Sequence, residues 1–296
     1  MNIARTLPSL LVLGSIWGLT PSLAKLAMAA GVPGLGFGFW AALGSASLLA
    51  LVCLVKRIPI PLDRGHLRYY AGAGLTGFAL ANFVAYTALP HIPAGFFALL
   101  MPLVPMLTVT GAALLGQERL NLRSVGGTAL GFAGVALAMA PGAALPDPSL
   151  IGWALFAALC PACYAASNLI GVQWAPRGTQ PLAAAAGTLA AAAVFMAVLG
   201  LALGQFHIPG EAEPLGEALL PMQSAMTAVA YLVYFGLLVR AGSVITSQSG
   251  YIVTIMGVVW GAIVFGERMG PLTLPAAALV FGGLWLVTHR RAPLGR

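Results

Sequence analysis

The stretch Gln117-Glu118-Arg119-Leu120 returns 149 residues later as Gly266-Glu267-Arg268-Met269, and each copy follows a long apolar segment. Aligned at this spacing without gaps, the residues around the two copies share ten identities in 34 positions. A chain this rich in Ala, Leu and Gly would give on the order of three by chance, so the two stretches mark an internal repeat. The fold therefore depends on what one repeat contains.

Charged residues are rare along the whole chain. Only 7% of the 296 residues are Asp, Glu, Lys or Arg, and 60% are hydrophobic, whereas an ordinary soluble domain is about one quarter charged. The expected solvent is therefore lipid, in which about 20 apolar residues form one crossing helix. Pro, Gly and charged residues divide the chain into ten such spans, at residues 7–30, 34–55, 67–89, 94–115, 122–140, 150–174, 182–203, 215–239, 243–265 and 272–288.

The basic residues predict how these spans are oriented, because short cytoplasmic connections carry an excess of Lys and Arg. With the N-terminus inside, 12 of the 14 Lys and Arg residues fall on the inner side; Arg268 lies in an outer connection and Lys25 within the first span. The apolar run after Arg5 imitates a cleavable signal peptide, but its removal would reverse this distribution. We expect a multi-pass protein of the bacterial cytoplasmic (inner) membrane with both termini in the cytoplasm.

The repeat and the span count together predict an inverted architecture. Each repeat holds five spans, and because five is odd, the second repeat enters the membrane from the opposite face. The fold class is an all-α integral membrane protein with ten transmembrane helices in two inverted five-helix repeats. The predicted units are residues 1–140, an extracellular linker at 141–149, and residues 150–296. Inverted repeats of this kind are typical of secondary transporters.

Two motifs resemble a known family. The run Gly14-Ser15-Ile16-Trp17-Gly18 in the first span and the Glu-Arg corners after spans 4 and 9 are similar to those of the EamA-type branch of the drug/metabolite transporter (DMT) superfamily. The nearest parallel is the group of YddG-type aromatic amino acid exporters. The resemblance implies that helices 1, 3, 4, 6, 8 and 9 line a central cavity, that helices 5 and 10 are peripheral, and that amino acids or other metabolites are exported.

Polar and aromatic side chains that recur on one face of a membrane helix indicate the interior of a bundle. On the helices that the family places around its cavity, we expect these residues to contact substrate: Trp17, Phe78, Asn82, Tyr86, Met101, Tyr164, Asn168, Tyr231, Tyr234, Ser249, Tyr251 and Trp260. Helix bends are expected at Pro21, Pro102 and Pro105, because proline removes a backbone donor.

Several of these residues have a structural alternative. Tyr86 could belong to an interfacial aromatic belt, and Asn82 could pair with another helix rather than with substrate. Lys25 could bind a substrate carboxylate or another anion, but the preferred interpretation is that it extends to the outer headgroups. For Glu267 and its counterpart in the first repeat, we expect pairing with the neighbouring arginine at each corner.

Some classes of function lack the residues they require. The basic residues are scattered and are not interleaved with stacking aromatics, which argues against nucleic acid as a partner. Cys160 and Cys163 form a C-x-x-C motif within an apolar span, where a structural role is expected. No cofactor, metal or ATP-binding loop is predicted. No Asp or Glu lies deep in a span, so a buried carboxylate relay for protons is not supported.

The sequence therefore predicts a transporter and not an enzyme. Its partners would be the lipid bilayer and small-molecule substrates, namely amino acids, with aromatic and amphipathic ones favoured, and related metabolites. Alternating access through a central cavity, uncoupled or weakly coupled, is the expected mechanism. The alternatives are an intramembrane enzyme that acts on a lipid or polyprenyl substrate, and an exchanger of another metabolite class. We expect a monomer, with a homodimer as the alternative.

Overall fold

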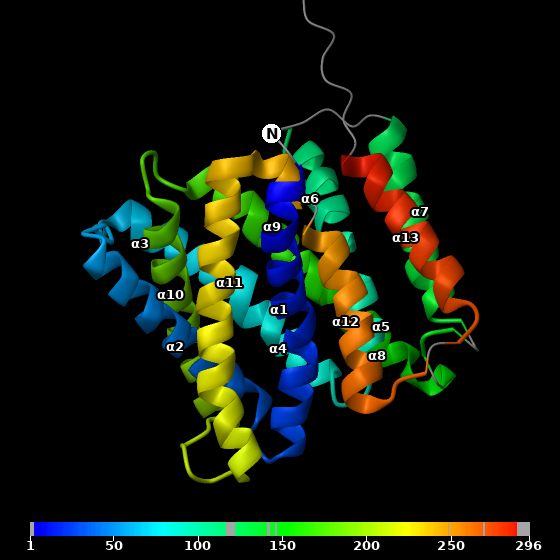
Figure 1. The fold of residues 1–296 in the computed structure, drawn as a ribbon, viewed down its shortest axis with the longest axis horizontal. Helices are drawn as coiled ribbons and strands as arrows, with labels where there is room; N and C mark the ends of the chain where they lie inside the picture. The colour runs from blue at the N-terminus through cyan, green and yellow to red at the C-terminus, as the bar shows by residue number, and fades with distance from the viewer. Residues whose placement is uncertain are drawn as a thin grey trace, which may run out of the picture.

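The computed structural model describes residues 3–116, 122–140, 143–145, 147–247, 249–268 and 270–288, and within these ranges it leaves the side chains of residues 3–5, 235, 238–247 and 288 undescribed. The first Glu-Arg corner, at residues 118 and 119, lies outside this part of the chain. Figure 1 shows a bundle made of helices.

The first repeat forms five consecutive rods. Three of its helices are continuous: α1 (Ile3–Ala29), α2 (Gly34–Val55) and α7 (Leu122–Ala138). The third rod consists of α3 (Arg64–Gly74), the π-helix η1 (Leu75–Leu80) and α4 (Ala81–Ala88). The fourth is divided into α5 (Ala94–Leu100) and α6 (Leu103–Leu114).

The second repeat forms five more rods. Its first rod joins the 3-10 turn η2 (Pro148–Leu150), α8 (Ile151–Ala157) and α9 (Leu159–Trp174). The others are α10 (Pro181–Ala202), α11 (Pro214–Ser247), α12 (Ser249–Phe265) and α13 (Thr273–Thr288). Each of the ten predicted spans corresponds to one rod.

Five of the described helical segments are long and apolar enough, by length and composition, to cross a membrane. They are Thr6–Ala29, Gly34–Val55, Ala94–Leu114, Pro148–Trp174 and Pro181–Ala202. Shorter apolar helices cover Leu122–Ala138, Ser249–Phe265 and Thr273–Val287.

One predicted boundary is wrong. The eighth span was expected to end at residue 239 and the ninth to begin at residue 243, but α11 continues to Ser247 and α12 begins at Ser249. A charged residue such as Arg240 marks where a helix can leave lipid, and it does not end the helix itself. In Figure 1 the last turns of α11 lie across the end of the bundle, as expected for a helix of 34 residues.

The packing of the helices follows the repeat. The α1–α12 contact of the first and ninth rods has its counterpart in the α6–α9 contact of the fourth and sixth. Likewise, α11 packs on α1 and α2, and the third rod packs on α9 and α10. The fifth and tenth rods, α7 and α13, pack against each other at one edge of the molecule (Figure 1). Exchange of the two halves therefore maps each of these contacts onto another, as a pseudo-two-fold relation requires.

The two ends of the bundle are named by the chain ends. Figure 1 shows the beginning of α1 and the end of α13 at the same end of the molecule, as an even number of crossings requires. This is called the terminal end, and the opposite one, where α1 and α12 finish and α5 begins, is called the distal end. The described part of the linker, Ala143 to Leu145, is buried and accepts a hydrogen bond from Gly270 N at the Ala143 carbonyl.

Candidate functional site

An aromatic group lies between α1 and α11. The Trp17 ring lies 5.6 Å from the ring of Tyr234 and 6.3 Å from that of Tyr231, the latter at an edge-on angle of 78°. Trp17, Tyr231 and Tyr234, called here the aromatic seam, thus come from the first and second repeats. Tyr164, on α9, packs against the main apolar core of the bundle.

A buried amide continues the seam toward the distal end. Gln223, which is 3% exposed, donates from Nε2 to the hydroxyl oxygens of Thr227, at 3.0 Å, and Thr20, at 3.3 Å. Gln223 was not predicted, although a signal existed: positions 223, 227, 231 and 234 share one face of a helix. We call Thr20, Gln223 and Thr227 the amide cluster.

The predicted residues of the third rod contact different neighbours. A π-helix widens the turn between Leu75 and Leu80, so the four-residue spacing used for the prediction does not hold through it. Phe78 packs against apolar clusters formed with α2 and α10. Asn82 is buried and donates from Nδ2 to the Phe78 carbonyl of its own rod, at 2.9 Å.

Tyr86 is not part of an interfacial belt, because it is only 5% exposed. Its ring packs edge-on against Phe37, 5.9 Å away, and against the backbone of α2 at Gly34. It also borders an open pocket of about 370 Å³ at the distal end. The lining residues of this distal pocket are Met28, Gly31, Val32, Pro33, Gly34, Tyr86, Thr87, Pro90 and Gln205.

The fourth rod breaks between α5 and α6. Pro102 and Pro105 carry no N–H, so neither can close an α-helical bond onto the carbonyl four residues before it. Instead Met101 N bonds to the Ala98 carbonyl at 3.2 Å and Val104 N to the Met101 carbonyl at 3.0 Å, which are tighter, 3-10-type bonds. At Pro21, in contrast, α1 continues as one helix.

At the distal end, α5 and α12 approach almost to backbone contact. A Cβ on Gly261 would lie 2.9 Å from the backbone nitrogen of Gly95, and one on Gly257 would collide with the side chain of Ala98. On its other side α12 meets α1, where a Cβ on Gly18 would lie 2.8 Å from Gly257 N. Only glycine permits helices to approach this closely.

The same end carries an ion pair between the halves. The Glu267 carboxylate accepts from the backbone N–H groups of Ala94, at 2.7 Å, and Gly95, at 2.8 Å, and lies 3.7 Å from Lys25 Nζ. Lys25 also donates to the Ile92 carbonyl at 3.0 Å. We call this arrangement the distal clamp. The carboxylate is stabilised there because the N-terminus of α5 presents unpaired donors and a positive dipole.

The distal clamp corrects one prediction. Glu267 caps the first helix of the fourth rod, and the ion pair that the described residues give it is with Lys25, not with Arg268. Because Lys25 pairs with Glu267, it is not a free anion site in this structure. The turn that makes this possible is Gly266, whose φ of +63° reverses the chain after α12.

The terminal end of the fourth rod is packed differently. There α6 meets α9, where a Cβ on Gly111 would touch the flexible end of Leu169, at 2.7 Å. The exposed Asn168 donates to the Thr108 hydroxyl at 3.2 Å. Near this end of α12, a Cβ on Gly250 would have no atom within 4 Å.

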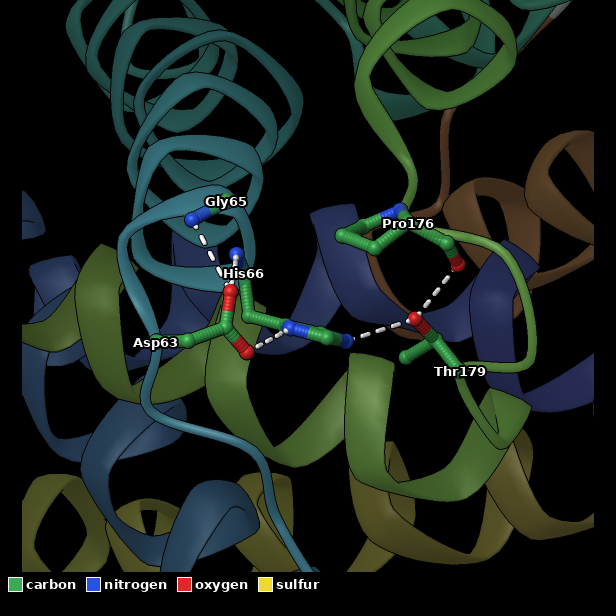
Figure 2. Close-up of polar contacts among 5 residues, drawn as sticks. All are labelled: Asp63, Gly65, His66, Pro176 and Thr179. Atoms are coloured by element: carbon green, nitrogen blue, oxygen red, sulfur yellow. Dashed lines mark hydrogen bonds and ion pairs between the residues drawn. The ribbon is translucent and has the colours of Figure 1, made fainter.

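The rim of the terminal end holds the two repeats together (Figure 2). Asp63 caps α3 and accepts a hydrogen bond from Nδ1 of His66, and Nε2 of His66 lies 2.8 Å from the Thr179 hydroxyl of the second repeat. That hydroxyl donates to the Pro176 carbonyl, so Nε2 is the donor. The His66 ring therefore links the Asp63 carboxylate of the first repeat to Thr179 of the second. The hydrogen bond from His66 holds the pKa of Asp63 below its ordinary value.

The remaining predicted residues lie apart from the aromatic seam. Tyr251 packs on Phe281 of α13, with 5.7 Å between the rings. Ser249 is buried at the start of α12, and the buried Nε1 of Trp260 has no hydrogen-bond partner among the described residues. Met101 stands at the α5–α6 break. In the part of the chain that the structure describes, no three His, Cys, Asp or Glu side chains gather as metal ligands would.

Comparison with known proteins places this geometry in a family. The model of the EamA-like transporter family matches residues 6–140 and 152–289, one match for each repeat. An uncharacterized protein of Pseudomonas aeruginosa, PA1977, is 31% identical over 252 residues, which cover 85% of this chain and 82% of that protein. A solved crystal structure superposes with a TM-score of 0.66 at 18% identity, over 95% of this chain and 97% of the other, and shows the same fold. The chain therefore belongs to the EamA-like transporter family, within the drug/metabolite transporter superfamily.

Proposed function

We propose that this membrane transporter exports amphipathic amino acids, aromatic ones included, and related small metabolites from the cytoplasm. The terminal end then faces the cytoplasm of a bacterium and the distal end faces outward, as the distribution of Lys and Arg favours. Membership in a transporter family gives no support to the alternative of an intramembrane enzyme.

The aromatic seam is the observation that supports this substrate class. Trp17, Tyr231 and Tyr234 offer ring faces and hydroxyl groups, and no charged side chain belongs to the seam. Such a surface suits a molecule with an apolar side chain and a few hydrogen-bonding groups. A phosphate-bearing metabolite needs several Arg or Lys side chains, whereas Lys25 is held by Glu267.

The packing difference along the fourth rod supports alternating access. The proposed moving units are residues 1–140 and 150–296, joined by an outer linker at 141–149. At the distal end α5 packs closely against α12, whereas at the terminal end α6 packs against α9. A path from the aromatic seam would therefore be open toward the terminal end and closed toward the distal end. Export requires that α5 move away from α12 and that Lys25 and Glu267 of the distal clamp separate.

The proposed substrate contacts are Trp17, Tyr164, Tyr231 and Tyr234. Trp17, Tyr231 and Tyr234 lie in one aromatic group, whereas Tyr251 and Asn168 have partners on other helices. No described carboxylate lies near the seam as a proton relay, so we propose transport down the substrate gradient, uncoupled or weakly coupled.

Counterflow of labelled amino acids into liposomes that contain the purified protein tests the proposal. Tyr234→Ala and Trp17→Ala should each lower the rate for phenylalanine about fivefold or more, because each removes a stacking surface worth on the order of 1 kcal/mol. Thermal unfolding confirms that each variant is folded. Failure to transport any of the twenty amino acids would contradict the substrate class, and a strict requirement for a pH gradient would contradict uncoupled transport.

A further inference from the structure

The amide cluster contains a buried acceptor without a donor. Gln223 is 3% exposed, and no described residue donates to its Oε1 atom. Its Nε2 atom, in contrast, is used twice, by Thr20 and by Thr227. One end of this side chain is therefore fully engaged and the other is not.

The orientation of the amide follows from its neighbours. The hydroxyl of Thr20 donates to the Ile16 carbonyl at 3.2 Å, so its oxygen can only accept from Gln223. The nitrogen must then face Thr20, and the oxygen must face away from it. A reversed amide would place two acceptors against each other. The unpartnered atom is thus the oxygen, which needs an N–H or O–H donor.

Buried polar atoms of native proteins nearly always have a partner, and an exception calls for an explanation. The position of Gln223 supplies one. It lies on the same face of α11 as Tyr231 and Tyr234, and its partner Thr20 lies one helical turn from Trp17 on α1. A buried acceptor oxygen therefore lies on the face of α11 that leads to the aromatic seam, close to the Trp17 end of that seam.

This combination fits a primary ammonium group. The ammonium is a strong donor, and a neutral amide oxygen accepts from it without the cost of burying a carboxylate. Aromatic faces also attract cations. A ligand that carries an ammonium group at one end and an apolar side chain at the other would meet both features within about one helical turn of α1.

We propose that Gln223 Oε1 accepts a hydrogen bond from the ammonium group of the substrate, while the substrate side chain packs on Trp17, the member of the aromatic seam that lies one helical turn from Thr20. This inference rests on the proposed function and makes it more specific. The amide cluster selects for a primary amine, and the aromatic seam selects for the side chain.

The test compares two probes that differ in the ammonium group alone. Phenylalanine carries it and 3-phenylpropionate does not. In the purified full-length protein, Gln223→Met keeps the length of the side chain and removes the acceptor. The dissociation constant of phenylalanine should rise about tenfold or more, because a hydrogen bond to a charged group is lost. That of 3-phenylpropionate should stay within about twofold of wild type, since this probe never made that bond.

Two further variants keep the result interpretable. Gln223→Glu retains an acceptor at the same place and should bind phenylalanine more tightly than Gln223→Met does. Gln173→Met changes an exposed glutamine on α9 and should leave both constants unchanged. Thermal unfolding of each variant shows whether it is folded. If Gln223→Met does not fold, Gln223→Glu serves as the test variant. Gln223→Glu must then still prefer phenylalanine to 3-phenylpropionate.

The outcomes separate this inference from the proposed function. If wild type binds phenylalanine and Gln223→Met binds it equally well, the inference is overturned and the proposed function stands. If Gln223→Met is less stable than wild type but discriminates the two probes as before, Oε1 has a purely structural partner such as a buried water, which also overturns the inference. If wild type binds and transports no amino acid, the proposed function itself fails.

Discussion

The two halves of the fourth rod lie at opposite ends of the bundle and meet different surroundings. At the distal end, α5 lies so close to α12 that a Cβ on Gly261 would stand 2.9 Å from Gly95 N. At the terminal end, α6 meets α9 through the Thr108–Asn168 hydrogen bond, which is exposed. One end is closed by backbone contact and an ion pair, and the other is joined by side chains.

The repeat makes this difference informative. Exchange of the halves relates the α1–α12 contact to the α6–α9 contact, so the two would be alike in a symmetric molecule. At the repeat spacing, however, Gly14 and Gly18 of α1 correspond to Cys163 and Ser167 of α9. Ser167 packs on the third rod, where its hydroxyl donates to the Ala73 carbonyl at 3.3 Å and where a Cβ on Gly77 would collide with it. The two glycines that bring α1 against α12 therefore have no glycine counterparts on α9 at the repeat spacing.

The largest effect is expected where the backbones touch. Gly257→Val would force its side chain into Ala98 and α1, and overpacking of this kind costs about 1–3 kcal/mol. We expect a lower melting temperature and loss of transport. The matched control is Gly250→Val on the same helix, where a Cβ has open space. Equal effects of the two substitutions on thermal unfolding would remove the distinction between the ends.

The distal clamp should come next. Glu267→Gln keeps the shape of the side chain but removes the charge that faces Lys25, which keeps only its hydrogen bond to the Ile92 carbonyl; the expected cost is about 1 kcal/mol. The distal end should open more often, so that Ala98→Cys reacts faster with a membrane-impermeant thiol reagent applied from outside.

A double variant is the control for this prediction. Lys25→Met combined with Glu267→Gln removes both charges, and it should be less destabilised than the sum of the single variants. Strict additivity would mean that the two side chains do not interact.

A smaller effect is expected at the terminal end. Asn168→Leu removes one exposed hydrogen bond to Thr108, which contributes on the order of 0.5–1 kcal/mol. The melting temperature should therefore change less than it does in Glu267→Gln. A larger change would show that α6 and α9 are held as firmly as the distal helices are.

The smallest effect concerns the rim and depends on pH. His66 holds the pKa of Asp63 below its ordinary value of about 3.9, so the folded protein binds this proton less readily than the unfolded chain does. The stabilisation is complete above the ordinary pKa and is lost as pH falls through the lowered one. Asp63→Asn should therefore flatten the decline of the melting temperature below about pH 5. An unchanged slope would mean that the rim contributes nothing measurable.

Much of the fold could be predicted because lipid imposes one simple rule. A crossing segment must be apolar and must satisfy its own backbone, so ten apolar runs could be recognised as ten helical rods. The error at α11 and α12 has the same origin. Arg240 indicates where the chain leaves lipid, but α11 continues past it, since a helix at the membrane surface needs no apolar run.

The candidate site was less predictable from the sequence. Helical periodicity brought Tyr231 and Tyr234 onto one face, and the structure places both against Trp17. For Phe78 and Asn82, substrate contact stays a prediction, and a π-helix at Leu75–Leu80 changes the number of residues per turn on which it was based. The prediction missed Gln223, whose importance comes from the position of Thr20, 203 residues away in sequence.

The sequence by itself determined the lipid environment, the ten spans, the internal repeat and the inverted orientation of the second repeat. These features depend on composition, on length and on whether the number of spans in a repeat is odd or even. Only the tertiary structure decided which groups meet. It paired Lys25 with Glu267, placed that carboxylate on the N-terminus of α5, and left the buried oxygen of Gln223 without a donor among the described residues. The physical reason is that hydrogen bonds and ion pairs act over about 3–4 Å between helices that are distant in sequence, and apolar periodicity carries no information about which helices become neighbours.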